Sequence, residues 1–152
     1  MRRRFTDLDR VWPAGLGRRL GAMIYDSFLV MAIWVSMALI AVALNQGEAN
    51  ESRLFQGLLF AMTFAFFAFC WMRAGMTLGM QAWRLRVQTL DGASITLVQS
   101  LIRFLVACLS LALLGLGYWW VLFDGQRRSW PDIASSTEVV VLPKPEKTLS
   151  KQ

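Results

Sequence analysis

Long apolar runs separated by short polar stretches dominate the chain. Residues 20–44 contain a single charged side chain, Asp26, and residues 54–72 contain none. A third apolar segment, 97–123, has Arg103 as its one charged residue. About 20 apolar residues suffice to cross the hydrocarbon core as a helix. The pattern therefore predicts an all-α membrane protein with about three hydrophobic helical segments.

The third segment allows two topologies. Gly115 and Gly117 can break it, and the 13 residues from Tyr118 to Trp130 are too few for a second full crossing. A re-entrant or broken helical hairpin returns the C-terminal tail to the side of the N-terminus, whereas a plain third span leaves it on the opposite side. The bent form gathers nearly all Lys and Arg on one side, so the positive-inside rule favours it.

The polar stretch 83–97 differs in kind from the apolar segments. It alternates between apolar and polar residues and contains Asp91-Gly92, a favoured two-residue turn. We expect a cytoplasmic β-hairpin here, with an irregular loop as the alternative. The β-branched run 137–142 predicts a strand that joins it. Around the membrane domain, 20–142, we expect a basic cytoplasmic arm, 1–19, and a disordered polar tail, 143–152.

Charge and composition narrow the function. The chain has 152 residues and a net charge of +6. Arginines that flank membrane spans account for this charge and place the N-terminus in the cytoplasm. The sequence has no basic stripe interleaved with aromatic residues, so we expect no nucleic-acid binding. The chain has no histidine, and both cysteines lie in apolar segments. We therefore expect no metal, no cofactor and no enzymatic activity.

Asp26 is the main candidate for chemistry, because an acid at membrane depth is costly and commonly functional. Arg19 lies seven positions earlier, two helical turns away on the same face. The two residues predict a polar column that enters from the cytoplasm. It is either an ion site or an ion pair that fixes helix register.

Three other charged residues have simpler interpretations. We expect Arg103 to be a snorkelling side chain at the interface, with a role as counter-ion for Asp26 or Asp132 as the alternative. Asp124 and Asp132 are expected to form local ion pairs with the neighbouring arginines, 127 and 128.

Arg19, Asp26 and the segment RRSWPDIASSTEVVV, 127–141, together resemble the RDD family of small integral membrane proteins. That family is named for one arginine and two aspartates, which correspond to Arg19, Asp26 and Asp132. The segment GMTLGMQAWRLRVQTLDGASIT, 75–96, is similar to the family's central motif, and the resemblance covers residues 14–142. Met80 and Pro131 stand where the family often has lysine and histidine, so two titratable groups of a proton relay are missing.

The resemblance implies a small ion or solute transporter of the bacterial cytoplasmic membrane, and some members have been linked to sodium/proton antiport. Asp26 would bind the cation or proton. Arg19 would adjust the pKa of Asp26 or compete with the cation, and Asp132 would act at the cytoplasmic mouth. Because about three helices are few for a pathway, we expect a homo-oligomer or a membrane-protein partner in the lipid bilayer. The alternative is a non-transporting scaffold, assembly factor or regulatory subunit of an envelope complex. The supporting polar candidates are Arg103, Asp124, Arg128, Thr137 and Thr77.

Overall fold

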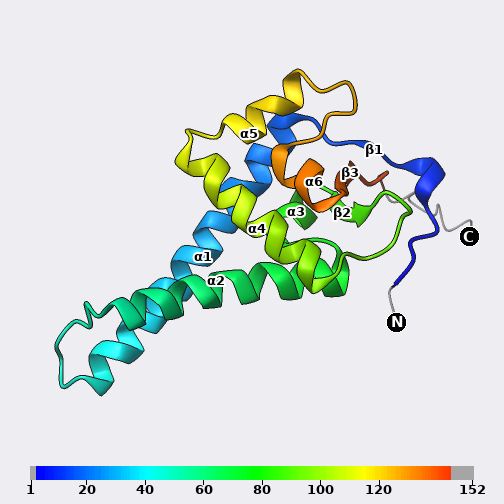
Figure 1. Ribbon diagram of the computed structural model, residues 1–152. Coiled ribbons are helices and arrows are strands. Elements are labelled where there is room, and N and C mark those ends of the chain that lie inside the picture. Colours follow the sequence, from blue (N-terminus) through cyan, green and yellow to red (C-terminus); the bar gives the residue numbers. More distant parts are fainter. Residues whose placement is uncertain (1–2, 145–152) are drawn as a thin grey trace, which may run out of the picture.

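Two long apolar helices, α1 (Leu16–Leu44) and α2 (Arg53–Ala74), form a hairpin that projects from the rest of the molecule (Figure 1). The computed structural model describes residues 3–144. Both helices are long and apolar enough to cross a membrane. Large side chains on their surfaces, such as Phe28 and Leu39, are exposed, as contact with lipid requires. The chain is a multi-pass membrane protein.

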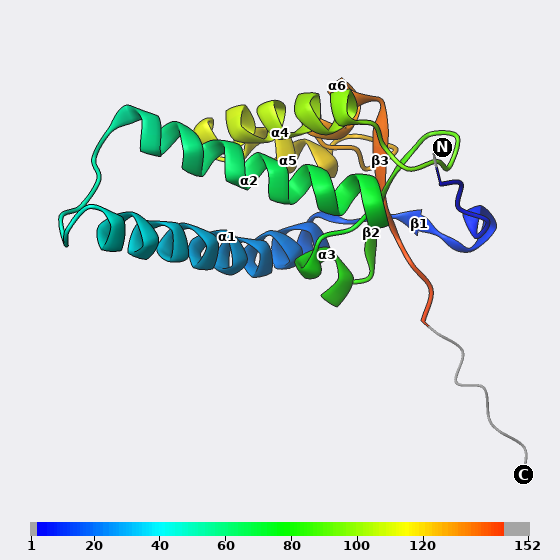
Figure 2. The ribbon, with the colours of Figure 1, turned by 90° about the horizontal axis from the view of Figure 1, so that it is seen from below.

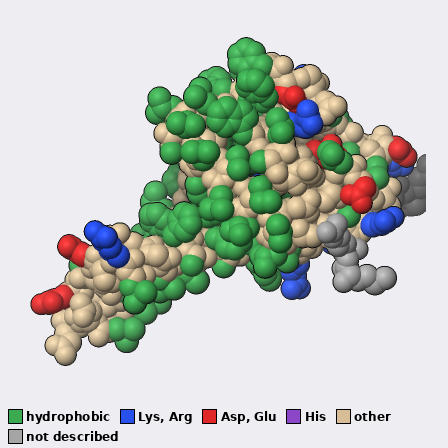
Figure 3. All heavy atoms as spheres, in the orientation of Figure 1, with side chains coloured by type: hydrophobic (Ala, Val, Ile, Leu, Met, Phe, Trp, Pro, Cys, Tyr) green, Lys and Arg blue, Asp and Glu red, His purple; other side chains and the backbone are tan. Residues whose placement is uncertain are grey.

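Local signals set the ends of these helices. Ser52 caps α2, because its hydroxyl accepts a hydrogen bond from the Phe55 amide, and Gly75 ends the helix in a left-handed conformation with φ 73°. α1 begins at Leu16, so Arg18 and Arg19 lie in its first turns and not in the arm predicted to end at residue 19. Charged side chains lie at the tip of the α1–α2 hairpin and at the opposite end of the molecule, with hydrophobic side chains between them (Figure 3).

The third hydrophobic segment is bent. α4 (Leu97–Ala112) is followed by α5 (Leu116–Trp119) and a 3-10 turn, η2 (Trp120–Leu122), at an angle of 104°. Leu114 and Gly115 make the bend with φ values of 58° and 78°, and the second suits a glycine. The predicted break in this segment is confirmed, and a straight third helix is contradicted by the 104° bend.

A small antiparallel sheet closes one end of the helices. Its strands are β1 (Trp12–Pro13), β2 (Leu85–Thr89) and β3 (Thr137–Val141), in the order β1-β3-β2. Because β1 and β3 pair, the N-terminal arm and the C-terminal strand lie at the same end of the molecule. The predicted strand in 137–142 is confirmed. Of the predicted tail, only 143 and 144 belong to the described residues, and 145–152 lie outside them.

The predicted hairpin over 83–97 is wrong in its second arm. Its first arm is β2, but β2 pairs with β3 and not with the residues after the turn. Ala93 instead makes an isolated bridge with Arg4. Thr96 and Gln99 then form a capping box that starts α4, so the chain turns helical where the second arm would have continued.

Two short helices, α3 (Leu78–Ala82) and α6 (Trp130–Ser135), lead into β2 and β3, and a 3-10 turn, η1 (Leu8–Arg10), precedes β1. Seen from below, α2 lies between α1 and α4 (Figure 2). The α2–α4 contact is aromatic, with the Phe104 ring centroid 5.2 Å from that of Phe60 and 5.4 Å from that of Phe64. These tilted ring contacts hold the bent segment against the hairpin.

The sheet predicts the sidedness of the two ends. In a background with Cys70 and Cys108 replaced by serine, cysteines introduced at Asp9 and Lys144 should react with an impermeant thiol reagent from the same side of the membrane. A cysteine at Asn50, in the connection between α1 and α2, should react from the opposite side. Labelling of Lys144→Cys together with Asn50→Cys would contradict the β1–β3 pairing in the membrane.

Candidate functional site

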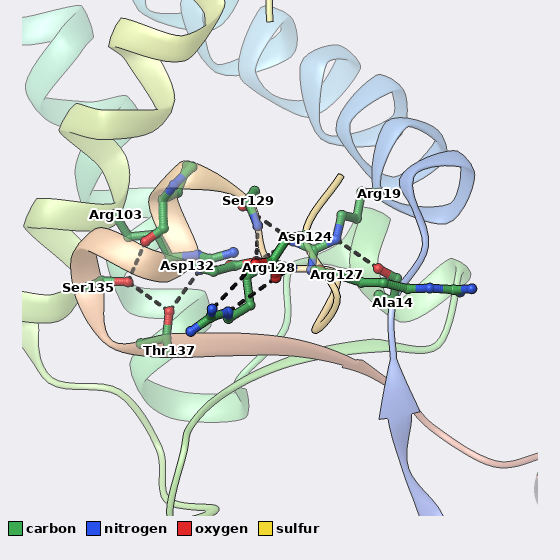
Figure 4. A network of polar contacts seen from close by, with 11 residues as sticks. Ala14, Arg19, Arg103, Asp124, Arg127, Arg128, Ser129, Asp132, Ser135 and Thr137 are labelled. Carbon is green, nitrogen blue, oxygen red and sulfur yellow. Dashed lines mark hydrogen bonds and ion pairs between the residues drawn. The ribbon is translucent and has the colours of Figure 1, made fainter. Parts of the chain in front are cut away.

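A fully buried carboxylate, Asp132, joins three elements that are distant in the sequence (Figure 4). Its Oδ2 accepts a hydrogen bond of 2.6 Å from Nη1 of Arg19, on α1. Its Oδ1 accepts a hydrogen bond from Nη1 of Arg103, on α4. Both arginines are more than nine-tenths buried. Asp132 itself lies on α6, so one side chain ties α1, α4 and α6 together.

Local structure holds Asp132 in place. Ser129 and Asp132 form the capping box of α6, in which the Ser129 amide donates to Asp132 Oδ2 at 2.9 Å. Pro131 lies in the same first turn, where it costs no backbone hydrogen bond. A carboxylate in the first turn also interacts favourably with the exposed amides of the helix N-terminus.

The electrostatics of Asp132 favour its charged form. Burial on its own raises the pKa of a carboxyl group. The charges of Arg103 and Arg19 and the hydrogen bond from the Ser129 amide outweigh burial, so the pKa of Asp132 lies below its ordinary value. Asp132 is therefore an ionised carboxylate that neutralises one of the two arginines.

The two arginines differ in how fully they are bonded. Arg19 uses all three nitrogens, because Nε donates to the Ala14 carbonyl at 3.1 Å and Nη2 to the Arg127 carbonyl at 2.8 Å. Within residues 3–144, Arg103 donates only through Nη1, to Asp132 and to the hydroxyl of Thr137 at 2.9 Å. The expected snorkelling position of Arg103 is wrong, since the side chain turns inward to Asp132. The alternative of a counter-ion for Asp132 is confirmed.

Asp26 lies apart from this cluster, and the expected pairing with Arg19 is absent from the described structure. Its Oδ2 accepts a hydrogen bond from the Thr77 hydroxyl and its Oδ1 one of 2.9 Å from the Gly79 amide. α3 approaches α1 so closely that a Cβ at Gly79 would lie 2.3 Å from the carbonyl oxygen of Ala22. Arg19 is bonded to Asp132, and the donors to Asp26 among the described residues are neutral.

A cavity of about 460 Å³ connects the two regions. Arg19, Asp26 and Arg103 all line it. Most of the remaining wall is apolar and comes from α1, α2 and α4, and Trp34 closes part of it with a 2.8 Å hydrogen bond to Thr63. Within residues 3–144, no group of three or more Cys, Asp or Glu side chains is placed to hold a metal ion.

The remaining candidates have structural partners. Asp124 forms the expected local pair with Arg128, at 3.2 Å, and the hydrogen bond from Arg128 lowers the pKa of Asp124. The expected local pairing of Asp132 is wrong, because its partners are the distant Arg19 and Arg103. Ser129 was not predicted, although Ser-x-x-Asp is a recognisable capping pattern. Gly79 lies within the central motif, 75–96, but the pattern did not predict its contact with Asp26.

The cluster predicts a large loss of stability when its acid is removed. Asp132→Asn leaves two buried arginines without a counter-charge, which should lower the free energy of unfolding by roughly 3–5 kcal/mol. Unfolding of the purified protein in mixed micelles by added sodium dodecyl sulfate measures this. Asp124→Asn is the matched control and should cost far less, because its pair is accessible to solvent. Equal losses for the two variants would contradict the role assigned to Asp132.

The lowered pKa of Asp132 also predicts a pH dependence. Its ionised form contributes stability that is fully present above the ordinary carboxyl pKa of about 3.9 and is lost as the pH falls through the lower pKa of the folded state. The difference in stability between the wild type and Asp132→Asn should be constant above about pH 5 and shrink towards acid pH. Groups that titrate in both proteins contribute equally to the two stabilities, so their contributions cancel in the difference. A difference that does not shrink in acid would refute a charge-based contribution.

Comparison with known proteins identifies the family. No curated protein and no solved structure matches the chain. The model of the RDD family matches residues 13–136, a range that contains Arg19, Asp26 and Asp132 and both long apolar helices. The chain therefore belongs to the RDD family.

Proposed function

We propose that this protein moves a small ion or solute across the membrane, and that Asp26 is the group that binds the proton or cation. The supporting observation is that Asp26 forms no ion pair with the described residues. It is only 5% exposed, it lines the cavity, and its hydrogen bonds within the described part come from a hydroxyl and an amide.

A buried carboxylate without a counter-ion is energetically unfavourable, because removing an ion from water costs several kcal/mol. A bound proton or a small cation relieves this cost. Thr77 and Gly79 fix both carboxylate oxygens, so the site keeps its shape whichever of the two occupies it. A site that accepts a proton or a cation in turn is what coupled transport requires.

In this proposal the cluster of Arg19, Asp132 and Arg103 has a supporting role. It fixes Arg19 and Arg103, which both line the cavity, at the place where α1, α4 and α6 meet. Its two arginines line the same cavity as Asp26 and disfavour a second cation there. Asp132 is thus a positioning residue, with both oxygens committed to arginines.

We further propose that the protein acts in a bacterial cytoplasmic membrane with its N-terminus inside, on the strength of the basic arm and the positive-inside rule. One hairpin and one bent segment enclose little space for a pathway, so we propose a homo-oligomer. The protein is proposed as a carrier and not as an enzyme.

The test is cation-dependent proton movement in inside-out vesicles from a host without its own sodium/proton exchangers. Wild type should dissipate an imposed pH gradient when sodium or potassium is added, and Asp26→Asn at equal expression should not. Asp9→Asn is the matched control, because it removes an acid outside the cavity and should transport like the wild type.

Transport that persists in Asp26→Asn would reject the assigned role of Asp26. Absence of transport in folded wild type would favour the alternative of a scaffold or regulatory subunit, in which the buried ion pairs fix helix register. That alternative predicts one stoichiometric, unrelated membrane protein after purification in mild detergent.

A further inference from the structure

Arg103 has an unused hydrogen-bonding edge. Its hydrogen bonds to the described residues all come from Nη1, which leaves Nε and Nη2 without an acceptor there. The side chain is buried, with only 6% of the residue exposed, and it lines the cavity. Nε and Nη2 form one edge of the planar guanidinium, a two-donor fork that matches the two oxygens of a carboxylate.

The charge of the cluster points to the same kind of ligand. Two buried arginines face one buried aspartate, so Arg19, Asp132 and Arg103 together carry a net positive charge. A buried charge without compensation is costly. Each of the three guanidinium nitrogens of Arg19 already donates to a protein group, whereas two nitrogens of Arg103 have no acceptor among the described residues, so the open position for an anion is at Arg103.

The cavity walls next to Arg103 are mostly apolar. Along α4, Arg103, Ala107 and Leu111 line the cavity at intervals of four residues, so they form one continuous strip. α1 and α2 supply the facing walls, with Val30 and Phe67 among their apolar side chains. A volume of about 460 Å³ lies in the range of small-molecule sites. The cavity thus has a charged group, Arg103, at one end and apolar walls along the rest of the α4 strip.

We propose that this cavity binds a single-chain amphiphilic acid. Its carboxylate lies on the Nε/Nη2 edge of Arg103, and its hydrocarbon chain runs along Ala107 and Leu111. The proposal goes beyond the assignment of Asp26 and does not depend on it, since Asp26 already accepts hydrogen bonds through both oxygens. The site is assigned to an acid with its own chain and not to the headgroup of a bilayer phospholipid.

Equilibrium dialysis of labelled decanoate tests the site, with full-length protein in phosphatidylcholine nanodiscs and empty nanodiscs as the blank. Decanoate should bind at least about tenfold more tightly than decanol, which has the same chain without the charge, because charge-assisted hydrogen bonds contribute on this scale. It should also bind more tightly than acetate, which lacks the chain. Equal binding of decanoate to decanol or to acetate would overturn the proposal.

Two variants locate the site. Arg103→Lys keeps the charge next to Asp132 but loses the fork, and should weaken decanoate binding by about tenfold. Ala107→Phe fills the apolar part and should abolish binding with Arg103 intact. Arg73→Lys, at an exposed arginine outside the cavity, is the matched control and should bind like the wild type.

Three further results separate this proposal from its alternatives. Unchanged binding in Ala107→Phe would overturn the proposal even if Arg103→Lys fails to fold. Displacement of decanoate by phosphatidylglycerol in the nanodiscs would assign the edge to a lipid headgroup and also overturn it. Asp26→Asn should bind decanoate, so loss of ion transport and loss of acid binding are distinguishable.

Discussion

The fold depends on one buried carboxylate shared by two arginines. Asp132 is fully buried and would be very costly there alone, but Arg19 and Arg103 each donate to one of its oxygens. Those donors come from the first and third hydrophobic segments, so the acid fixes where both segments meet α6. β3 follows α6 directly and pairs with β1 and β2. The sheet that closes this end of the molecule therefore rests on the position of Asp132.

The same interaction determines the state of Asp26. Arg19 lies two turns from Asp26 on the same helix and is the nearest cation in the sequence pattern, yet its three nitrogens are all bonded elsewhere. The structure thus separates Asp26 from Asp132. Asp132 is neutralised and held in place by arginines, and Asp26 accepts hydrogen bonds from neutral donors beside a cavity. An acid of the second kind can exchange a proton or a cation, whereas an acid of the first kind is suited to hold helices together.

Local patterns in the sequence predicted the parts of the fold that depend on local physics. The apolar runs gave the spans, the β-branched run gave β3, and Gly115 together with the distribution of arginines gave the bend. The errors concern partners. β2 pairs with a strand about 50 residues away and not with the residues after its turn, and Arg19 pairs with an acid 113 positions away. Spacing along a helix shows that Arg19 and Asp26 share a face, but it carries no information on a stronger partner delivered by a distant segment.

Arg103 links the structural cluster to the cavity. Its Nη1 donates to Asp132 and Thr137, and the same side chain lines the cavity that Asp26 also lines. Because the walls between them are apolar, charges in this cavity are weakly screened. An anion on Arg103 and a cation on Asp26 therefore attract each other, and by linkage each must raise the affinity of the other. Under the two proposals, the separation of Asp26 from Asp132 gives the cavity one site for a cation and one for an anion, which are coupled through their charges.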